Sequence, residues 1–456
     1  MIAARPGGVP TVVIDARSAD DVLGALEAMR AGDTDWRGGR VFSLVYKIPG
    51  AAGEAHDELL HRAHRLYASA NLLNPMAFPS LKRMEDDLVR VAGRLMHCSG
   101  AVGAVTSGGT ESILCAVAAY RDRARRERPW IRRPELVVPT TIHPAFDKAA
   151  HYFGVRLVKV AVGVGQRADA AAMIRAIGRR TIGLVASAPQ YPHGVVDPIG
   201  ALGAEAARRG LPLHVDACVG GFLLPWLERL GRPIPIWDFR VPGVTSISAD
   251  LHKYAYAGKG ASVLLWRSID AMQHQIFVAT DFPGGIYASP TLLGTRPGGP
   301  LAAAWAAVHT LGDRGYLELT RTALDAAERL RAGIAAIPGL VELGPGDATI
   351  VAFGPGRDAG LDIYAIADRL EARGWTVDRQ HRPASIHLTV TANHAAVVGD
   401  YLADLASAVD DVRREPGLAR GGTAPMYGMA AKLPFRRLVA SQVRRVIAEL
   451  YTRGGS

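Results

Sequence analysis

The stretch Ser248-Ala-Asp-Leu-His-Lys253-Tyr decides the interpretation of this sequence, because it places a lysine directly after a histidine. It follows an apolar, strand-like run, Val244-Thr-Ser-Ile. Only seven lysines occur in the 456 residues, and Lys253 and Lys259 flank one short loop. A lysine amine that is held in place, with its pKa lowered, can do covalent chemistry, and pyridoxal phosphate is the commonest cofactor that uses one. Lys253 is therefore a candidate Schiff-base lysine.

A surface lysine after a strand is the simpler interpretation of the His-Lys pair taken alone. A pyridoxal-phosphate site needs three more parts. They are a helix start that binds the phosphate, a carboxylate for the pyridine nitrogen, and an aromatic or imidazole ring over the cofactor face. Candidates for all three occur upstream in the sequence.

The candidate phosphate site is the segment from Ala104 to Tyr120, which contains Gly108, Gly109 and Thr110. Two glycines let the backbone turn tightly and approach an anion, and Thr110 offers a hydroxyl. Apolar residues recur at helical spacing from Ile113 onward, so free N–H groups at a helix start would face the phosphate. An ordinary loop that enters a helix is the alternative.

The candidate carboxylate is Asp216, which ends the buried-strand pattern Leu213-His-Val-Asp216. The carboxyl end of a strand lies at the edge of an open α/β sheet, where ligands of such folds bind. Asp216 could keep the pyridine nitrogen protonated there, although a helix N-cap is the alternative role. The candidate ring is His143, which lies between the phosphate segment and Asp216 in sequence order.

These motifs together resemble the sphingosine-1-phosphate lyase family. The resemblance runs from about Tyr46 to Tyr451. The phosphate loop and the His-Lys pair indicate only the wider group of fold-type I pyridoxal-phosphate decarboxylase-like enzymes. Three further motifs are similar to the lyases in particular: Pro189-Gln-Tyr-Pro-His-Gly194, Gly284-Gly-Ile-Tyr-Ala-Ser-Pro290 and Arg296-Pro-Gly-Gly.

The resemblance implies retro-aldol cleavage of the C2–C3 bond of a phosphorylated long-chain base, to a fatty aldehyde and phosphoethanolamine. Lys253 would hold the cofactor as an internal aldimine, Asp216 would stabilise the carbanion through the ring, and His143 would stack on it. The resemblance also assigns four residues to the cofactor phosphate, with Gly108 shaping the turn. They are Gly109, Thr110, Ser248 and His252.

For the substrate side, the resemblance implies roles for Lys259, Tyr46 and Tyr191. Lys259 would attract the substrate phosphate or help proton transfer, and the tyrosines could donate or accept protons after adjustment of their pKa values. Packing aromatics are the alternative. Asn74 stands where the eukaryotic lyases carry a histidine. A homodimer with its active site at the interface is implied by the family.

A pyridoxal-phosphate amino-acid decarboxylase is the main alternative function. It would share the phosphate loop, His143, Asp216 and the His252-Lys253 pair, but it would bind a carboxylate in place of a substrate phosphate. Tyr46, Tyr191 and Lys259 favour the lyase.

Composition and charge bear on three further questions: nucleic-acid binding, membrane contact and the redox state of the compartment. The formal net charge of +10 invites a nucleic-acid interpretation, but acids interrupt the arginine cluster at 121–128 and no nucleic-acid motif accompanies it. A basic surface could equally attract phosphorylated lipid or contact an anionic membrane peripherally. Three unpatterned cysteines favour a reducing compartment and give no zinc motif.

The sequence contains no apolar run near the roughly 20 residues that span a bilayer, and no secretory signal follows Met1. We therefore expect a soluble, cytoplasmic protein, with export to a host cell left open.

Strand-like runs alternate with alanine-rich helical stretches, which predicts an α/β fold with a mainly parallel sheet and crossover helices. We expect three parts: an N-terminal helical segment over 1–95, a large cofactor-binding domain over 96–310, and a smaller α+β domain over 311–456. This arrangement corresponds to the fold-type I transferase fold of the family that the chain resembles.

Overall fold

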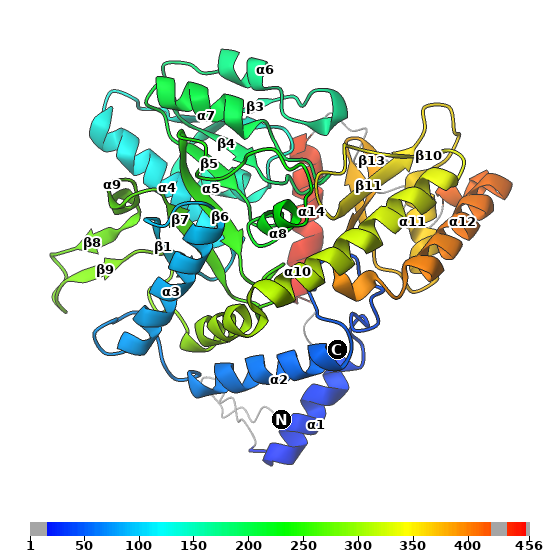
Figure 1. The fold of residues 1–456 in the computed structure, drawn as a ribbon, viewed down its shortest axis with the longest axis horizontal. Helices are drawn as coiled ribbons and strands as arrows, with labels where there is room; N and C mark the ends of the chain where they lie inside the picture. Colours follow the sequence, from blue (N-terminus) through cyan, green and yellow to red (C-terminus); the bar gives the residue numbers. More distant parts are fainter. Residues whose placement is uncertain (1–15, 421–435, 453–456) are drawn as a thin grey trace, which may run out of the picture.

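A seven-stranded sheet forms the centre of the large domain (Figure 1). The computed structural model describes residues 16–420 and 436–452. The strand order is β1-β7-β6-β5-β4-β2-β3. The strands are β1 (Val102–Thr106), β2 (Glu135–Pro139), β3 (Arg156–Val160), β4 (Thr181–Ser187), β5 (Leu213–Asp216), β6 (Val244–Asp250) and β7 (Ser262–Trp266). The predicted parallel sheet is confirmed for β3, β2, β4, β5 and β6.

Strand β7 runs antiparallel to both β6 and β1, which the alternating pattern of strands and helices did not predict. The connection from β6 to β7 explains this direction, because it covers only residues 251–261 and contains no helix. A parallel pair needs a crossover of a dozen or more residues, whereas a short connection reverses the chain. Lys253 and Lys259 both lie on this reversing loop.

Neighbouring residues of a strand belong to different hydrophobic clusters, one on each face of the sheet. Val137 lies in one hydrophobic cluster, whereas Leu136 and Val138 lie in another. Leu264 and Leu265 are divided in the same way. Since successive strand residues point to opposite faces, both faces of the sheet are covered, as in other parallel sheets.

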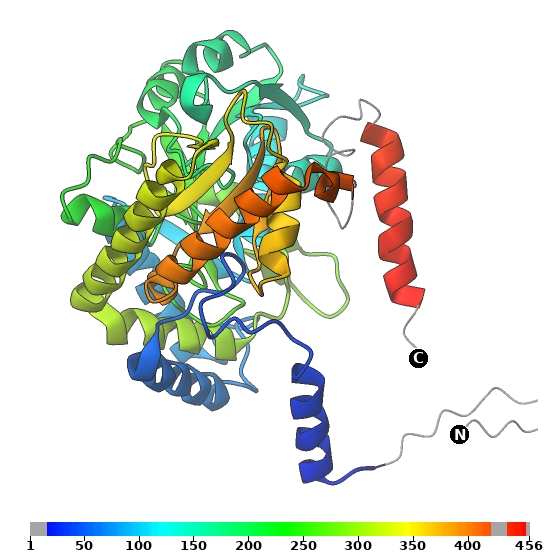
Figure 2. The same cartoon turned by 90° about the vertical axis from the view of Figure 1, so that its right-hand side faces the viewer.

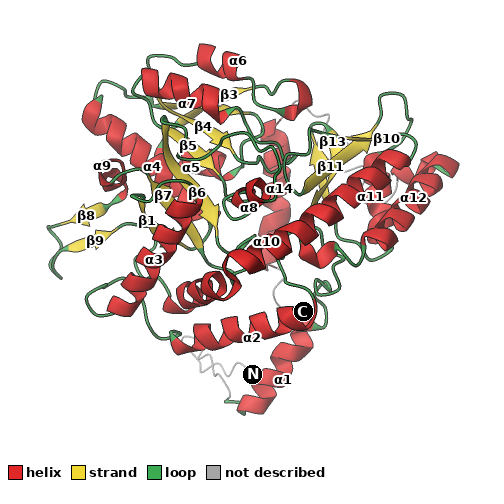
Figure 3. Cartoon of the chain, in the orientation of Figure 1, coloured by secondary structure: helices red, strands yellow, loops and turns green. Residues whose placement is uncertain are grey.

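Helices pack on both faces of this sheet (Figure 3). Residues of α4 and α5 contribute to one cluster, and residues of α3, α7, α8 and α10 contribute to the other. The helices of this part are α2 (Gly50–Leu66), α3 (Pro79–Leu95), α4 (Gly109–Glu127), α5 (Ala145–Phe153), α6 (Ala170–Arg175), α7 (Ile199–Arg208), α8 (Leu224–Arg229), α9 (Ile269–Met272) and α10 (Gly298–Ala336). A hairpin of β8 (Phe277–Ala279) and β9 (Tyr287–Ser289) projects from the edge.

The smaller C-terminal unit is an antiparallel sheet covered by helices, so the predicted α+β character is confirmed. Helix α10 leads into it and changes direction at Gly312, where φ is 55°. The sheet order is β10-β11-β13-β12. The elements are β10 (Leu340–Glu342), β11 (Ile350–Pro355), α11 (Ile363–Glu371), β12 (Asp378–His381), β13 (Ala384–Thr389) and α12 (Val398–Arg414).

The N-terminal segment is not purely helical, because residues 41–43 join the C-terminal unit. Val41 forms a β-bridge with Thr376, and the buried Phe42 ring stacks on His394 with centroids 4.4 Å apart. This anchor fixes the path of the chain just before Tyr46.

Helices α1 (Ala19–Arg30) and α14 (Arg436–Thr452) stand clear of the main body (Figure 2). Helix α1 has no buried residue. Within the two described ranges, no helix combines the length and apolar character that a membrane crossing requires.

Candidate active site

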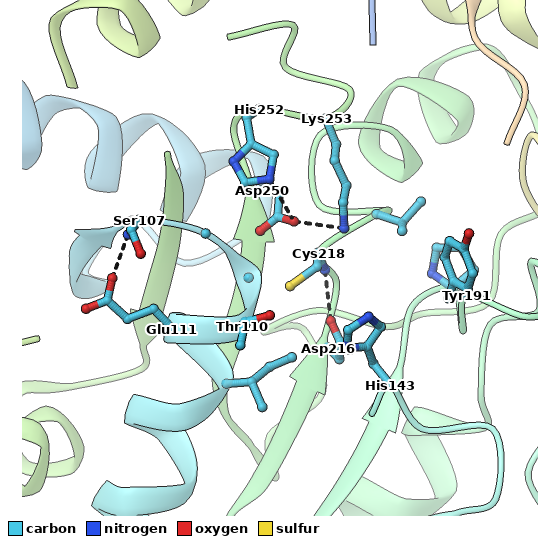
Figure 4. A pocket seen from close by; sticks show the side chains of 15 residues that line it. Ser107, Thr110, Glu111, His143, Tyr191, Asp216, Cys218, Asp250, His252 and Lys253 are labelled. Atoms are coloured by element: carbon cyan, nitrogen blue, oxygen red, sulfur yellow. Dashed lines mark hydrogen bonds and ion pairs between the residues drawn. The ribbon is translucent and has the colours of Figure 1, made fainter. Parts of the chain in front are cut away.

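A cavity of about 340 Å³ opens where β5 and β6 end and α4 begins (Figure 4). Its volume falls in the range of small-molecule sites, about 300–1,000 Å³. Eight of the residues singled out from the sequence line it: Gly108, Gly109, Thr110, His143, Tyr191, Asp216, His252 and Lys253. The structure therefore brings together side chains that are up to 145 positions apart, from Gly108 to Lys253.

The start of α4 forms one wall of the cavity. The first N–H groups of a helix have no partner within the helix, and those of α4 begin at Gly109. A Cβ atom at Gly109 would lie 2.6 Å from Cys218 Sγ and 2.7 Å from Asp250 Oδ1. Only glycine therefore fits at this position, which leaves the backbone N–H groups accessible to an anion.

Glu111 holds the phosphate loop in place, a role that the sequence motif did not reveal. One of its carboxylate oxygens accepts a hydrogen bond from Ser107 N, at 2.7 Å. The other accepts from the N–H groups of Leu292 and Leu293, at 3.0 and 3.1 Å. Glu111 was visible in the motif as an acid in the first turn of a helix, but its contact across 181 positions was not.

Asp216 lies at the end of β5, as predicted. The residue is 7% exposed, and its Oδ1 atom accepts from Cys218 N at 3.1 Å and contacts Ser248 Oγ at 3.5 Å. Ser248 also hydrogen-bonds to His214 Nε2, at 3.2 Å. Ser248 does not line the cavity, so its geometry favours support of Asp216, and its predicted contact with the cofactor phosphate stays a prediction.

Lys253 forms an ion pair with the buried Asp250, with Nζ 2.8 Å from Oδ2. Burial lowers the pKa of Lys253, but the charge interactions with Asp250, Tyr46 and Cys218 and the hydrogen bond to Asp250 together outweigh burial and raise the pKa above its ordinary value. The expectation of a lowered pKa at Lys253 is therefore wrong for the free amine beside Asp250. Asp250 was not among the predicted site residues, although it lies three positions before the lysine.

Lys259 and Tyr46 do not line the cavity but lie beside Lys253. Lys259 is an exposed residue overall, yet its ammonium donates to the Leu44 carbonyl and lies 5.3 Å from the centroid of the Tyr46 ring. Burial of this ammonium, and then repulsion by Lys253, lowers the pKa of Lys259 to about 8. The lowered lysine pKa is thus found on the second lysine of the loop.

Both tyrosines have weakly acidic hydroxyls. Burial raises the pKa of Tyr46 to about 12, against the opposing charge of Lys253. Burial, followed by the charge of Asp378, also raises the pKa of Tyr191. Both hydroxyls therefore stay protonated near neutral pH. They can form hydrogen bonds, but their pKa values are shifted away from those of efficient proton-transfer groups.

His143 faces the cavity from the loop before α5 (Figure 4). Its Nδ1 atom accepts from Ala145 N at 3.2 Å, which fixes the orientation of the ring. The ring meets Tyr191 edge-on, with centroids 6.5 Å apart. A flat ring held over the cavity is what a stacking partner for a pyridine ring requires.

Two other residues from the sequence motifs lie outside this cavity. Asn74 is exposed, and its Oδ1 atom accepts from Met76 N at 3.0 Å and from Ala77 N at 3.3 Å, so it stabilises a turn. Arg296 forms an ion pair with the buried Glu85, which favours a role in holding its loop.

The residues present fit pyridoxal phosphate. The glycine-lined helix start suits its phosphate, Asp216 suits its ring nitrogen, His143 suits its face, and Lys253 suits its aldehyde. A buried oxygen, Asp250 Oδ1, also has no hydrogen-bond partner among the described residues, as expected where a ligand group completes the site.

The fold and this site define a pyridoxal-phosphate enzyme of fold type I. Residues 60–339 match the family model of the pyridoxal-dependent decarboxylase conserved domain. A glutamate decarboxylase structure from Lactobacillus brevis shares the fold, with a TM-score of 0.76 at 20% identity over 90% of this chain and 96% of that one.

More specific similarity exists to lyases. The chain is 43% identical to sphingosine-1-phosphate lyase of Arabidopsis thaliana over 92% of its own length and 77% of the relative's. The structure of sphingosine-1-phosphate lyase from Burkholderia pseudomallei superimposes with a TM-score of 0.84 at 38% identity, covering 94% of this chain and 98% of that one. This chain belongs to the sphingosine-1-phosphate lyase family.

Proposed function

We propose that this protein cleaves the C2–C3 bond of a phosphorylated sphingoid base, and releases a fatty aldehyde and phosphoethanolamine. The observation that carries the proposal is the pair of lysines on the β6–β7 loop. Lys253 lines the cofactor cavity, and Lys259 lies close enough for the charge of Lys253 to help lower its pKa to about 8. Decarboxylation removes no hydroxyl proton, so it does not require a base of this kind beside the cofactor.

The residues of this chain divide the work between them. Bound pyridoxal phosphate supplies a ring that accepts the electron pair of the breaking bond. Lys253 would hold the cofactor, and Asp216 would keep the ring nitrogen protonated. Lys259 in its neutral form would take the proton from the C3 hydroxyl, so that C3 leaves as the aldehyde carbon and a proton is then added at C2.

The pKa of Lys259 suits this task. With a pKa of about 8, a useful fraction of the amine is neutral near pH 7 and can accept a proton, while its conjugate acid can return one. Tyr46 and Tyr191 stay protonated, so they orient substrate groups by hydrogen bonding.

Turnover of sphingosine 1-phosphate by the purified protein with added pyridoxal phosphate tests the proposal. Fatty aldehyde and phosphoethanolamine are followed together by mass spectrometry. We expect both products, and we expect Lys253→Ala to lose both of them along with the visible absorbance of bound cofactor. Cofactor binding without either product, but with carbon dioxide released from amino acids, would identify an amino-acid decarboxylase.

We also propose a homodimer with its active site at the interface. Exposed apolar side chains on the β8–β9 hairpin support it, since Phe277, Phe282 and Ile286 are 60%, 61% and 80% exposed. Contiguous exposed apolar surface is typical of interaction sites. Light scattering of the purified protein would report the mass of a dimer, and a monomeric mass would contradict the proposal.

A cytoplasmic location with peripheral contact to anionic membranes completes the proposal. The free cysteines Cys98, Cys115 and Cys218 suit a reducing compartment. The net charge of +10 suits an anionic lipid surface. Co-sedimentation with phosphatidylserine vesicles, lost at high salt, is the expected result, and no sedimentation at low salt would contradict membrane contact.

A further inference from the structure

Asp378 connects the C-terminal unit to the cavity. It begins β12, the edge strand of the smaller sheet, and its Oδ2 atom accepts a hydrogen bond from the Tyr191 hydroxyl at 2.6 Å. Its other oxygen, Oδ1, accepts from Ser43 Oγ at 3.3 Å. Tyr191 lines the cavity, but Asp378 does not. Tyr191 therefore lies between the Asp378 carboxylate and the cavity.

The Tyr191 ring is held from a second side by His387. The two rings stack with centroids 4.2 Å apart and an angle of 29° between their planes. His387 is fully buried, and its two nitrogens contact the Pro192 carbonyl at 3.2 Å and Thr389 Oγ1 at 2.8 Å. Burial lowers the pKa of His387, so the ring is neutral and its Nδ1–H donates to the carbonyl.

The hydrogen bond to Asp378 determines what Tyr191 offers to the cavity. A phenol has one proton to donate, and here that proton is directed to a carboxylate. The lone pairs of the Tyr191 oxygen remain available to accept a hydrogen bond from a ligand. Charge-assisted bonds of this kind are short and strong, which keeps the phenol in one orientation.

We propose that Asp378 is a positioning residue for the cleavage reaction, which acts by holding Tyr191 as a fixed hydrogen-bond acceptor for the substrate. This inference rests on the proposed function, because the substrate donor that Tyr191 would meet is the hydroxyl or ammonium group beside the C2–C3 bond. Asp378 contacts neither substrate nor cofactor. Because it belongs to the C-terminal sheet and bonds to Tyr191, it fixes where the Tyr191 hydroxyl lies relative to the reacting groups.

A double-mutant cycle tests this inference. Asp378→Asn should lower kcat about 10- to 100-fold, the range for one hydrogen bond to a charged group, with KM changed less than about threefold. Tyr191→Phe should have a similar effect. In the Tyr191→Phe background, Asp378→Asn should change kcat by less than about threefold, because its target hydroxyl is already absent.

Two further readouts separate positioning from folding. The visible absorbance and the affinity of bound pyridoxal phosphate should be unchanged in Asp378→Asn. Asp404→Asn is the matched control, since Asp404 accepts from an aromatic donor in the same unit, Trp375 Nε1, at 2.8 Å. We expect it to retain wild-type kcat. If Asp378→Asn does not fold, Asp378→Glu replaces it in the same cycle, since the longer side chain displaces the carboxylate.

Multiplicative losses in the double variant, or an equal loss in Asp404→Asn, would overturn the inference. Failure of the proposed function is a separate result, namely no aldehyde from the wild-type protein. The cycle is then measured on affinity for phosphoethanolamine, read from the visible band of the bound cofactor. Equal affinities in all four proteins would overturn the role of Asp378, and non-additive losses would support it.

Discussion

The two sides of the active site are built in different ways. The cofactor cradle, which comprises Gly108, Gly109, Thr110, Asp216, His252 and Lys253, lies at the start of α4, at the end of β5 and on the first residues of the β6–β7 loop. The substrate cluster of Tyr46, Tyr191 and Lys259 lies on loops outside the regular elements, and Tyr191 is held by the C-terminal unit. The cradle residues lie on or directly beside α4, β5 and β6, whereas the cluster depends on packing between distant segments.

This difference predicts how the two sides respond to change. A substitution in the cradle should alter cofactor affinity, because the affected atoms meet the cofactor. A substitution in the substrate cluster should leave the cofactor bound and alter turnover or its pH dependence. The following variants test this division, from the largest expected effect to the smallest.

Lys259→Arg should lower kcat at pH 7 about 100-fold, the lower range for loss of a general acid-base group. Since the pKa of Lys259 is lowered to about 8, its neutral fraction rises as the pH rises through 8. The wild-type kcat should therefore rise between about pH 7 and pH 9, and the arginine variant should lack this rise because arginine stays charged.

The pH dependence of wild-type kcat can also contradict the role of Lys259 as a base. Activity that falls above pH 8 in the wild type would show that the ammonium form is needed, as it would be for binding the substrate phosphate. Lys159→Ala provides the control, because Lys159 pairs with Asp147 on the surface and should have wild-type kinetics. Cofactor absorbance should be retained in both variants.

Gly109→Ala should weaken pyridoxal phosphate binding about 10- to 100-fold, because overpacking costs roughly 1–3 kcal/mol. The added Cβ atom would lie 2.6 Å from Cys218 Sγ. Gly200→Ala is the matched control, since Gly200 is also in a helix and has nothing within 4 Å of an added Cβ atom. Equilibrium titration with the cofactor provides the measurement, and equal affinities in both variants would mean that the helix start does not form the cradle.

The contrast also explains what the sequence could predict. Each cradle residue lies in a short local motif, such as Gly108-Gly-Thr110 or His252-Lys253, and a few neighbouring residues are enough to predict its role. Asp216 follows from the end of a buried-strand pattern. The antiparallel direction of β7 was missed because the general α/β pattern favours parallel strands, whereas the short β6–β7 connection is what sets the direction.

The substrate cluster was accessible only through family resemblance. Asp378 gave no local signal, since its contact with Tyr191 spans 187 positions. The expectation of a lowered pKa at Lys253 failed for a different reason, because Asp250 lies in the same motif but the motif does not show that the two side chains pair. Asp250 helps to raise the pKa of Lys253 against burial, and burial followed by the charge of Lys253 lowers the pKa of Lys259, so both values depend on side-chain positions that a motif does not specify.

Tyr46→Phe should have the smallest effect, a loss of about 3- to 10-fold in kcat, as expected for one neutral hydrogen bond. Burial raises the pKa of the Tyr46 hydroxyl to about 12. Below about pH 10 the phenol does not ionise, so the variant should keep the wild-type pH profile and the wild-type cofactor affinity. Steady-state kinetics between about pH 6 and pH 10, with a cofactor titration beside them, would measure both.

Tyr401→Phe is the matched control for Tyr46, because among the described residues the buried Tyr401 hydroxyl has no hydrogen-bond partner. It should have wild-type kinetics. If Tyr46→Phe abolished the rise in activity near pH 8, then Tyr46 would be the titrating group and Lys259 would not. If instead it released the cofactor, Tyr46 would belong to the cradle, and the division between the two sides of the site would fail at the residue where they meet.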